Sequence, residues 1–404
     1  MSRYNNISSN YSMNFDYIYK TKFAQEYSEI LSNLHSFEKE MEISEVEHGV
    51  ILPPKPCEGL HWGMGGVIDD EGNLVKFSRT YGAFGKEYAY EDLNESHKDE
   101  TVYFCGLLPL HWGHFLIDFI CRLYVLIEND EGYRIAYFSR DEDGEIYGTF
   151  AELLGYLGIG LDRFVKITEP SLFAKVIVPE PSMGYAFEFC AEKYRLVVDK
   201  VKERALASSE VQNLSPVKRI YFTRMNFSST DVGEKEIAEC FEKNGFQILS
   251  PERLSLAEQI FYISNADEIA SVSGTIPHNF IFANPTTRLI YLNRNPLPNY
   301  AQFRINYIFG LCPVWIDVYN RRCLKGKLGH NMFFRIWIEV SDCLKKFLRD
   351  YNMLMPTHTW ISYFRNYIRY KYIWDIHPVL WKTKMYVLRP FRIKRVKIVV
   401  CSTH

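Results

Sequence analysis

The feature that most constrains the fold is a regular alternation of strand and helix patterns between residues 219 and 294. Short runs of β-branched and aromatic residues alternate there with amphipathic runs of helical spacing. Parallel strands need crossover connections of this length, usually helices, so the pattern favours a doubly wound parallel sheet. The expected strands are 219–224, 246–251, 268–273 and 288–294, and the expected helices are 233–245, 255–266 and 277–284.

A second α/β unit is expected upstream, because a chain of 404 residues is long enough for two domains. Its predicted strands are 101–108, 134–139 and 175–181, and its predicted helices are 112–129, 149–159 and 188–209. The polar stretch 209–217 reads as a linker between the two units. We therefore expect three parts, which are 1–208, 209–325 and a C-terminal extension, 326–404.

Charge is distributed unevenly along the chain. The formal net charge is -2, which argues against a nucleic-acid binder driven by bulk charge. Residues 321–404, however, hold 18 Lys or Arg and 4 Asp or Glu, which gives this segment a net charge of +14. The rest of the chain, residues 1–320, is an acidic body with a net charge of −16. This asymmetry indicates an anionic partner for the extension: a membrane surface, a nucleic acid or the acidic body itself. No nucleic-acid-binding module is recognisable, and we expect no nucleic acid.

The extension also interleaves aromatic and basic residues. Helices are predicted at 333–348 and 361–374, followed by a basic β-like end at 389–400. Such a segment suits contact with an anionic membrane surface through 326–404. The alternative is a helical appendage that packs across both domains and keeps its charges in water.

The expected location is the cytoplasm, with a peripheral position on the inner face of the cell membrane. The first residues have no apolar core of a signal peptide, and no run approaches 18 apolar residues. The nine cysteines are scattered and never form Cys-x-x-Cys, which fits a reducing compartment and indicates neither a disulfide framework nor a zinc site.

The first candidate site lies in the predicted helix 112–129. His114, Asp118 and Arg122 are spaced i, i+4 and i+8, so they share one helix face. A polar row on an apolar helix must be paired or face a cleft. Asp118 is our first candidate for a catalytic base and His114 the second; the alternative is an Asp118–Arg122 ion pair that only orients the helix. His111 and Arg122 are expected in the same cleft, and no further ligand cluster points to a metal.

The second candidate site follows the strands of the alternating region. Ligands bind outside the carboxyl ends of parallel strands, and Thr223-Arg224 ends one strand, where a guanidinium can hold a diphosphate. Ser273-Gly274-Thr275 follows another strand and opens the helix that carries Asn279, which is typical of an anion site. Glu258-Gln259 lies on the preceding helix. Each feature taken alone also fits an ordinary turn or surface pair.

Several stretches follow one family pattern in order. His114 to Asp118 with Arg122-Leu123 matches "His-Trp-Leu-x-Asp-x-x-Pro-Arg-Leu", with Phe115 for Trp and Cys121 for Pro. Thr223-Arg224 matches a strand ending in Ser-Arg, Gly233-Glu234 keeps the acid of an Asn-Glu pair, and Gly245-Phe246 matches Gly-Phe. Pro251 to Ile260 matches "Pro-Glu-x-Leu-Ser-x-x-Glu-Gln-Ile", and 272–282 keeps Gly274, Asn279 and Phe282 of a final motif, with Ser273 for His and Thr275 for Ala.

This pattern resembles glycosyltransferase family 61, over roughly residues 60–295. The resemblance implies a GT-B-like architecture, in which two Rossmann-like domains face a cleft, with the helical basic extension added. It implies an inverting, metal-independent transferase (EC 2.4) that acts in capsular or exopolysaccharide biosynthesis. A UDP-sugar is the expected donor, a glycan or lipid-linked oligosaccharide is the expected acceptor, and no cofactor is expected. Donor binding would fall to Arg224, Thr223, Glu258, Gln259, Ser273, Gly274, Thr275 and Asn279.

Two other classes remain open. The substitution at Ser273 favours a non-catalytic nucleotide- or sugar-binding scaffold of a polysaccharide assembly complex. An epimerase would need a Gly-x-Gly-x-x-Gly fingerprint and a Tyr-x-x-x-Lys pair in a suitable context, and the sequence offers neither.

Overall fold

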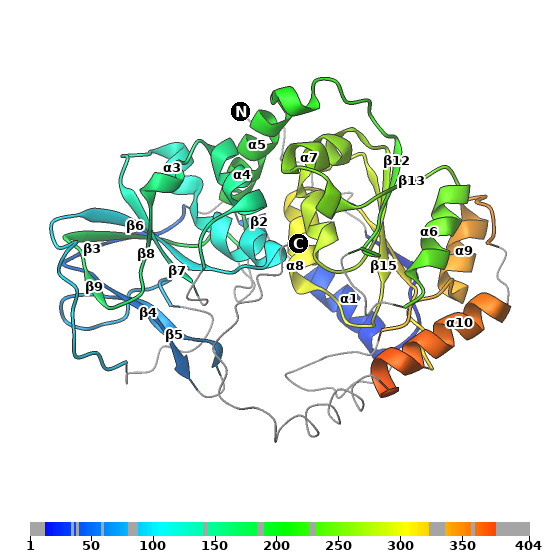
Figure 1. Ribbon diagram of the computed structural model, residues 1–404, viewed down its shortest axis with the longest axis horizontal. Coiled ribbons are helices and arrows are strands. Elements are labelled where there is room, and N and C mark those ends of the chain that lie inside the picture. Colours follow the sequence, from blue (N-terminus) through cyan, green and yellow to red (C-terminus); the bar gives the residue numbers. More distant parts are fainter. Residues whose placement is uncertain are drawn as a thin grey trace, which may run out of the picture.

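The computed structural model contains two α/β units that lie side by side (Figure 1). It describes residues 13–33, 36–37, 40–57, 60–79, 88–139, 144–183, 190–226, 232–322, 336–356 and 360–376. The α/β class predicted from the sequence is confirmed, with one mainly parallel sheet in each unit. The predicted basic end 389–400 lies outside the described residues.

The first unit is built on a five-stranded sheet of order β3-β10-β6-β7-β8. Strands β10, β6, β7 and β8 are parallel, and β3 pairs with β10 in the antiparallel sense. Numbered along the chain, the parallel strands follow the order 3-2-1-4 of a Rossmann half. The strand bounds are Ile43–Glu47 (β3), Thr101–Leu108 (β6), Arg134–Ser139 (β7), Phe164–Lys166 (β8) and Lys175–Pro179 (β10).

A smaller antiparallel sheet, β5-β4-β9, stands below this unit in Figure 1. Its strands are Val50–Cys57 (β4), Leu60–Ile68 (β5) and Ser171–Leu172 (β9). β5 leads into a turn in which Asp69 accepts hydrogen bonds from the backbone N–H groups of Glu71 and Asn73. The larger helices of the unit are α3 (Tyr124–Glu128), α4 (Gly148–Leu157) and α5 (Lys193–Leu206).

The second unit has a six-stranded parallel sheet of order β13-β12-β14-β15-β16-β1. The first five strands follow the doubly wound order 2-1-3-4-5, and β1 from the start of the chain adds the edge. Their bounds are Asn14–Tyr17 (β1), Arg219–Phe222 (β12), Gln247–Leu249 (β13), Glu268–Val272 (β14), Arg288–Asn293 (β15) and Val314–Asp317 (β16). The helices around it are α1 (Lys22–Ser32), α6 (Glu234–Lys243), α7 (Leu256–Asn265), α8 (Tyr300–Ile308) and α9 (Asp342–Asp350), with the 3-10 turn Ile276–Phe282.

Alternating side chains of this sheet enter two different cores. Ile220 and Phe222 of β12 join a cluster with α7 and α8, whereas Tyr221 joins a cluster with α6 and α9. The first cluster continues into the other unit through Leu116 and Val197, so one hydrophobic core spans both units. Because α5 and α4 also pack against α7, the two sheets are held in a fixed relation by apolar burial.

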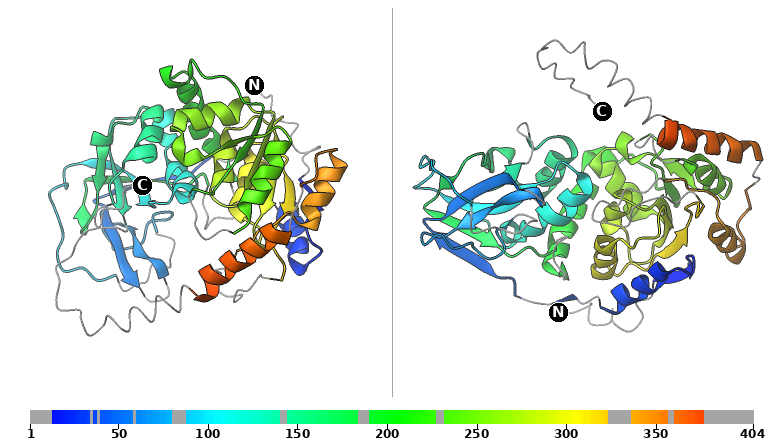
Figure 2. Two further views of the ribbon diagram at one scale, coloured as in Figure 1. Left: turned by 45° about the vertical axis from the view of Figure 1, so that its right-hand side comes forward. Right: turned by 90° about the horizontal axis from the view of Figure 1, so that it is seen from below.

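The predicted domain boundaries need two corrections. Residues 13–33, assigned to 1–208, form β1 and α1 of the second unit, where β1 pairs with β16 and the blue helix α1 lies beside the unit (Figure 2). Part of 326–404 also belongs to this unit, because Leu344, Phe347 and Leu348 of α9 are fully buried against the sheet. The helix predicted at 333–348 therefore begins only at Asp342, with Ser341 as its N-cap, and residues 336–341 are extended.

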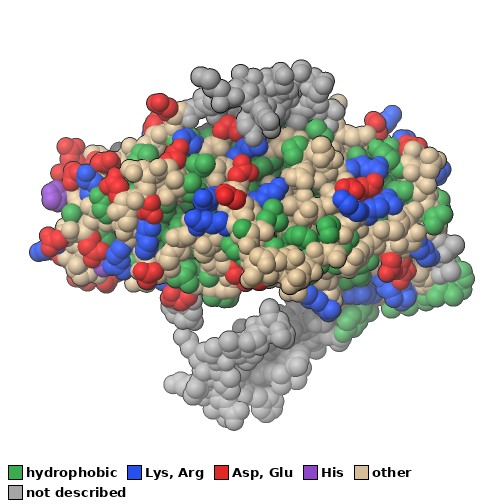
Figure 3. Space-filling view, turned by 90° about the horizontal axis from the view of Figure 1, so that it is seen from above, with side chains coloured by type: hydrophobic (Ala, Val, Ile, Leu, Met, Phe, Trp, Pro, Cys, Tyr) green, Lys and Arg blue, Asp and Glu red, His purple; other side chains and the backbone are tan. Residues whose placement is uncertain are grey.

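The helix predicted at 361–374 is confirmed as α10 (Trp360–Lys371), continued by a π-helical turn, Tyr372–Ile376. Among the described residues, no helix is both long enough and apolar enough to cross a bilayer. Viewed from above, acidic side chains gather toward the end of the molecule occupied by the first unit (Figure 3).

Candidate functional site at the junction of the two units

Each sheet has a point where the direction of its crossovers reverses, and ligands favour the crevice beyond the strand ends at such a point. In the second sheet this point lies between β12 and β14, which Arg224 and Ser273-Gly274 follow. In the first sheet it lies between β6 and β10, and His111 to Asp118 follow β6. The two predicted sites therefore extend from equivalent positions of the two sheets.

Arg224 is buried beside the backbone of Gly274. Its Nη1 donates to the carbonyl oxygen of Ser273 at 3.4 Å. Gly274 has φ +147°, and a Cβ on this residue would lie 2.2 Å from Nη1 of Arg224. Glycine is therefore required here both for the backbone conformation and for the position of the guanidinium.

Arg294 supplies a second guanidinium that sequence reasoning missed. Its Nη2 would lie 3.8 Å from a Cβ on Gly274. Its backbone N–H donates to the Ser273 hydroxyl at 3.3 Å. The signal was available, since Arg294 directly follows β15 at the same sheet edge. Two guanidinium groups near one glycine form a geometry that suits a dianion such as a diphosphate.

Thr223 and Glu234 fix the turn that carries Arg224. The buried carboxylate of Glu234 accepts hydrogen bonds from the Thr223 hydroxyl at 3.0 Å and from the Arg224 backbone N–H at 2.7 Å. The Thr223 hydroxyl thus faces into the protein, and we assign this residue to positioning Arg224. Glu234 was noted only as the acid of Gly233-Glu234, and its role became visible with the fold.

His114 and Asp118 form a close pair. Nδ1 of His114 lies 2.8 Å from Oδ2 of Asp118, as the i, i+4 spacing predicts. The side chain of Asp118 is 5% exposed, whereas that of His114 is 28% exposed. Residues Phe115–Phe119 form a π-helical turn, a rare element that often marks functional sites. The carboxylate holds one ring nitrogen, so the other can act on a ligand.

Arg122 departs from the predicted row. The π-helical turn and the 3-10 turn after it change the rotation per residue, and the Arg122 side chain is buried. Its guanidinium donates to the carbonyl oxygens of Pro179 and Phe77, the latter at 2.6 Å. These bonds make Arg122 a scaffold residue that fixes the end of β10, not a cleft residue.

Two further histidines lie near the pair. Desolvation lowers the pKa of His111, and the nearby positive charges of His114 and Arg224 lower it further. Burial lowers the pKa of His278 to about 4, although its Nδ1 lies 2.8 Å from Oε1 of Gln302. His278 was not singled out from the sequence.

A hydrogen-bonded chain connects the units. Trp112 donates through Nε1 to Oδ1 of Asn279 at 2.6 Å, and Asn279 donates to Oε1 of Gln259 at 3.0 Å. Gln259 in turn donates to the carbonyl oxygen of Pro251 at 3.0 Å. The close approach of the two units at this point requires Gly113, because a Cβ there would lie 2.9 Å from Cδ2 of His278 in the second unit.

A cavity of about 260 Å³ opens at this junction. The first unit contributes Trp112, Thr149 and Phe150, two of them aromatic. The second unit contributes Arg224, Pro251, Glu252, Gln259, Thr275, Ile276 and Asn279. Four of the predicted donor-binding residues, Arg224, Gln259, Thr275 and Asn279, are therefore brought to one cavity.

Glu258 has a different place. Its backbone N–H donates to the Ser255 hydroxyl, and its carboxylate accepts from the Ser255 backbone N–H at 2.8 Å. This capping box begins α7, and Glu258 is not among the residues that line the cavity. The predicted anion-binding helix at 277–284 is only the short 3-10 turn Ile276–Phe282, so a helix dipole contributes little there.

Over the described part of the chain, no three His, Cys, Asp or Glu side chains gather in a way that could hold a metal ion. A comparison with protein families supplies the deciding observation: the family model Glycosyltransferase 61 matches residues 112–290. Over these residues the chain is similar to glycosyltransferase family 61. The match begins at Trp112 and ends within β15, so it includes His114, Asp118, Arg224 and Gly274 and ends before Arg294.

This similarity supports glycosyltransferase activity, which uses a donor and an acceptor. No curated protein matches its sequence.

Proposed function

We propose that this glycosyltransferase transfers a sugar from a nucleotide-sugar donor to a glycan acceptor, with inversion at the anomeric carbon and without a metal ion. The observation that carries the proposal is the cavity at the unit junction, which has Arg224 in its wall. The His114–Asp118 pair follows Trp112, another residue of that wall, within the same short segment. This arrangement supplies a base from one unit and a cation from the other.

His114 is the base that the geometry favours. Asp118 was our first choice from the sequence, but its carboxylate is almost fully buried and adjoins His114. In the proposed step, the acceptor oxygen bonds to the anomeric carbon while the bond from that carbon to the diphosphate oxygen breaks. The acceptor proton passes to Nε2 of His114, and Asp118 stabilises the resulting imidazolium.

The leaving diphosphate gains negative charge in this step. Arg224 and Arg294 would stabilise that charge without reorganisation, because Gly274 and the Glu234 network hold Arg224 in place. Trp112 and Phe150 offer apolar ring faces in the cavity, a common lining for the organic part of a ligand. A UDP-sugar is the donor that we propose.

The first experiment measures nucleotide binding by thermal shift with the full-length protein. UDP and UDP-sugars should raise Tm, since a ligand at about 100 times its Kd stabilises the folded state by about 2.7 kcal/mol. If another nucleotide, such as CMP or GDP, raises Tm instead, the proposed donor site is supported and the proposed donor changes to a sugar linked to that nucleotide. If no nucleoside phosphate binds, the proposed donor site is wrong.

The second experiment separates catalysis from binding. His114→Ala and Asp118→Asn should leave nucleotide binding intact and lower the rate of sugar transfer or donor hydrolysis by about 10²–10⁴-fold, the usual contribution of a general base. Tyr147→Ser, at an exposed residue that does not line the cavity, is the matched control and should retain the wild-type rate. A wild-type rate in His114→Ala would remove His114 from the mechanism.

A second candidate is a non-catalytic scaffold that binds the nucleotide-sugar. It is favoured by Ser273, which stands where the family usually has His and whose hydroxyl accepts the Arg294 backbone N–H. Nucleotide binding without transfer or hydrolysis across a panel of nucleotide-sugars would support the scaffold. For the transferase, we propose a role in capsular or exopolysaccharide biosynthesis at the inner face of the cell membrane, with a lipid-linked oligosaccharide as acceptor.

A further inference from the structure

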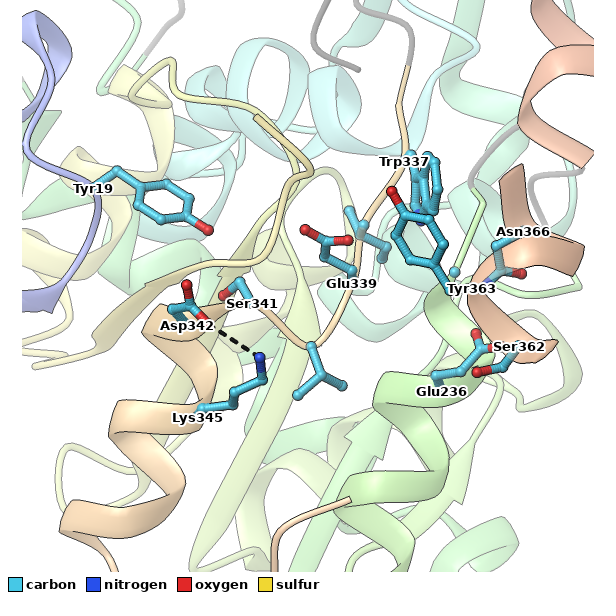
Figure 4. A pocket seen from close by; sticks show the side chains of 13 residues that line it. Tyr19, Glu236, Trp337, Glu339, Ser341, Asp342, Lys345, Ser362, Tyr363 and Asn366 are labelled. Atoms are coloured by element: carbon cyan, nitrogen blue, oxygen red, sulfur yellow. Dashed lines mark hydrogen bonds and ion pairs between the residues drawn. The ribbon is translucent and has the colours of Figure 1, made fainter. Parts of the chain in front are cut away.

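Helix α10 is attached to the second unit along one side only. Arg365 pairs with the buried Glu236 of α6, with 2.6 Å between Nη2 and Oε1. Tyr370 is buried, and its ring centroid lies 5.7 Å from that of Trp337, which belongs to the extended segment before α9. Figure 4 shows Ser362, Tyr363 and Asn366 of α10 facing the groove that contains Glu236 and Trp337.

The opposite side of α10 carries an apolar ridge exposed to solvent. Every fourth residue belongs to it: Trp360, Phe364, Ile368, Tyr372 and Ile376. The exposed fractions are 78% for Trp360, 53% for Phe364 and 52% for Ile368, and Ile361 beside them is 61% exposed. Both views of Figure 2 place α10 at the periphery of the molecule. Soluble proteins rarely expose a contiguous aromatic and aliphatic ridge unless it binds something.

Charge indicates what the ridge binds. Arg365, Arg369 and Lys371 lie on the same helix, and residues 377–404, which follow directly, contain seven Lys or Arg and no Asp or Glu. Two copies of α10 placed ridge to ridge would bring these like charges together, which opposes self-association. An anionic lipid surface satisfies both properties, since it accepts aromatic and aliphatic side chains and attracts clustered Lys and Arg.

We infer that the ridge Trp360–Phe364–Ile368–Tyr372–Ile376 is a membrane-docking surface that enters the interfacial region of an anionic leaflet, with the basic residues after Ile376 adding electrostatic attraction. The helix lies on the membrane rather than across it, held to the protein by the Arg365–Glu236 pair and the Tyr370–Trp337 contact. The assignment depends on these residues alone, and only its link to a lipid-linked acceptor rests on the proposed function.

The test uses the full chain with sedimenting vesicles of phosphatidylcholine containing about 30% phosphatidylglycerol, an anionic fraction that generates the surface potential, and vesicles of pure phosphatidylcholine. The wild type should bind the anionic vesicles, and high salt should weaken that binding. The triple variant W360S/F364S/I368S should bind at least about 10-fold more weakly, because three apolar side chains no longer enter the interface.

The matched control is Y147S/L161S, which changes two exposed apolar residues of the first unit and should bind like the wild type. Point variants are preferable to a chain ending at residue 325, because that cut would remove α9 and its buried core residues. Circular dichroism melting of the triple variant should match the wild type, and Y372S/I376S tests the same ridge if it does not.

Equal vesicle binding by the wild type and the ridge variants would overturn the inference, as would failure of the wild type to bind anionic vesicles. A change in oligomeric state in the triple variant, without a change in vesicle binding, would assign the ridge to a second copy. No donor or acceptor is present in this assay, so its failure leaves the proposed transfer reaction standing. Loss of transfer would likewise leave membrane docking standing.

Discussion

The two strand-end regions each contain a buried arginine beside a glycine of positive φ, yet they use the pair differently. After β6, Arg122 lies beside Gly106, where a Cβ would be 3.5 Å from Nε, and its donors go to backbone carbonyls. After β12, Arg224 lies beside Gly274, where a Cβ would be 2.2 Å from Nη1. The Arg224 side chain lines the cavity. One guanidinium therefore fixes the scaffold, and the other lines the cavity.

The comparison shows that burial and residue type do not separate a structural arginine from a binding arginine. The deciding property is the set of groups around the guanidinium. Pro179 and Phe77 offer carbonyl oxygens to Arg122, whereas Arg224 donates to the carbonyl oxygen of Ser273 and also has the guanidinium of Arg294 nearby. Placing two guanidinium groups near each other costs electrostatic free energy, and a bound anionic ligand would offset that cost.

The largest expected effect comes from Arg224→Ala. Loss of the guanidinium should lower the turnover of sugar transfer by about 10²–10³-fold, equivalent to about 3–4 kcal/mol of transition-state stabilisation. Thermal unfolding should change little. Steady-state kinetics and calorimetry on one preparation measure turnover and thermal stability. A large loss of stability with normal turnover would indicate that Arg224 has a structural role like that of Arg122.

Arg122→Ala should show the opposite pattern. The buried carbonyl oxygen of Pro179 and the partly buried one of Phe77 lose their donor, so the free energy of unfolding should fall by about 2–4 kcal/mol, measured by urea denaturation. Arg134→Ala is the control, since its pair with Glu100 is partly exposed and worth at most about 1 kcal/mol. Turnover per folded molecule should stay near the wild-type value. A loss of turnover without a loss of stability would indicate that Arg122 acts in the cleft, as predicted from the sequence.

The two glycines offer a matched pair of substitutions. Gly274→Ala places a methyl group where the Arg224 guanidinium lies, so the donor KM should rise and turnover should fall, by about 10-fold or more overall. Gly106→Ala meets Arg122 only at ordinary contact distance, so its effect should be backbone strain of about 1 kcal/mol in stability. Equal kinetics for the two variants would show that Gly274 does not position Arg224.

The smallest expected effect is on the pH dependence of stability. Burial holds the pKa of His278 at about 4, below its usual 6.5, so the unfolded chain binds this proton first as the pH falls. Stability should therefore decrease between about pH 6.5 and 4 through this residue. His278→Gln should flatten that part of the unfolding curve, and an unchanged slope would assign the acid sensitivity to other groups.

The local part of this architecture follows from the sequence. The predicted strands 101–108 and 134–139 coincide with β6 and β7, and the alternation from residue 219 yields β12 to β15 with α6 and α7 between them. These elements have strong periodicity and clear ends at Gly or polar residues. The predicted strand ends also placed Arg224 and Gly274 at the correct sheet edge.

Long-range pairing explains what was missed. β1 is only four residues long, and nothing in its own pattern reveals a partner about 300 positions later in β16. Arg122 fits the helical row of His114 and Asp118, but the π-helical turn redirects it toward backbone acceptors from residues 77 and 179. Arg294 and Trp112 became candidates only when the sheet edge and the neighbouring unit were in place.

By itself, then, the sequence determined the α/β class, most strand and helix positions, the His114–Asp118 spacing and the Arg224–Gly274 neighbourhood, because these depend on residues close together in the chain or on the direction of parallel strands. Only the tertiary structure decided that Arg122 braces the end of β10 whereas Arg224 lines the cavity, that Asp118 is buried beside the more exposed His114, and which face of α10 is open to solvent. Those properties depend on burial and on hydrogen-bond partners supplied by distant segments, and no local pattern encodes them.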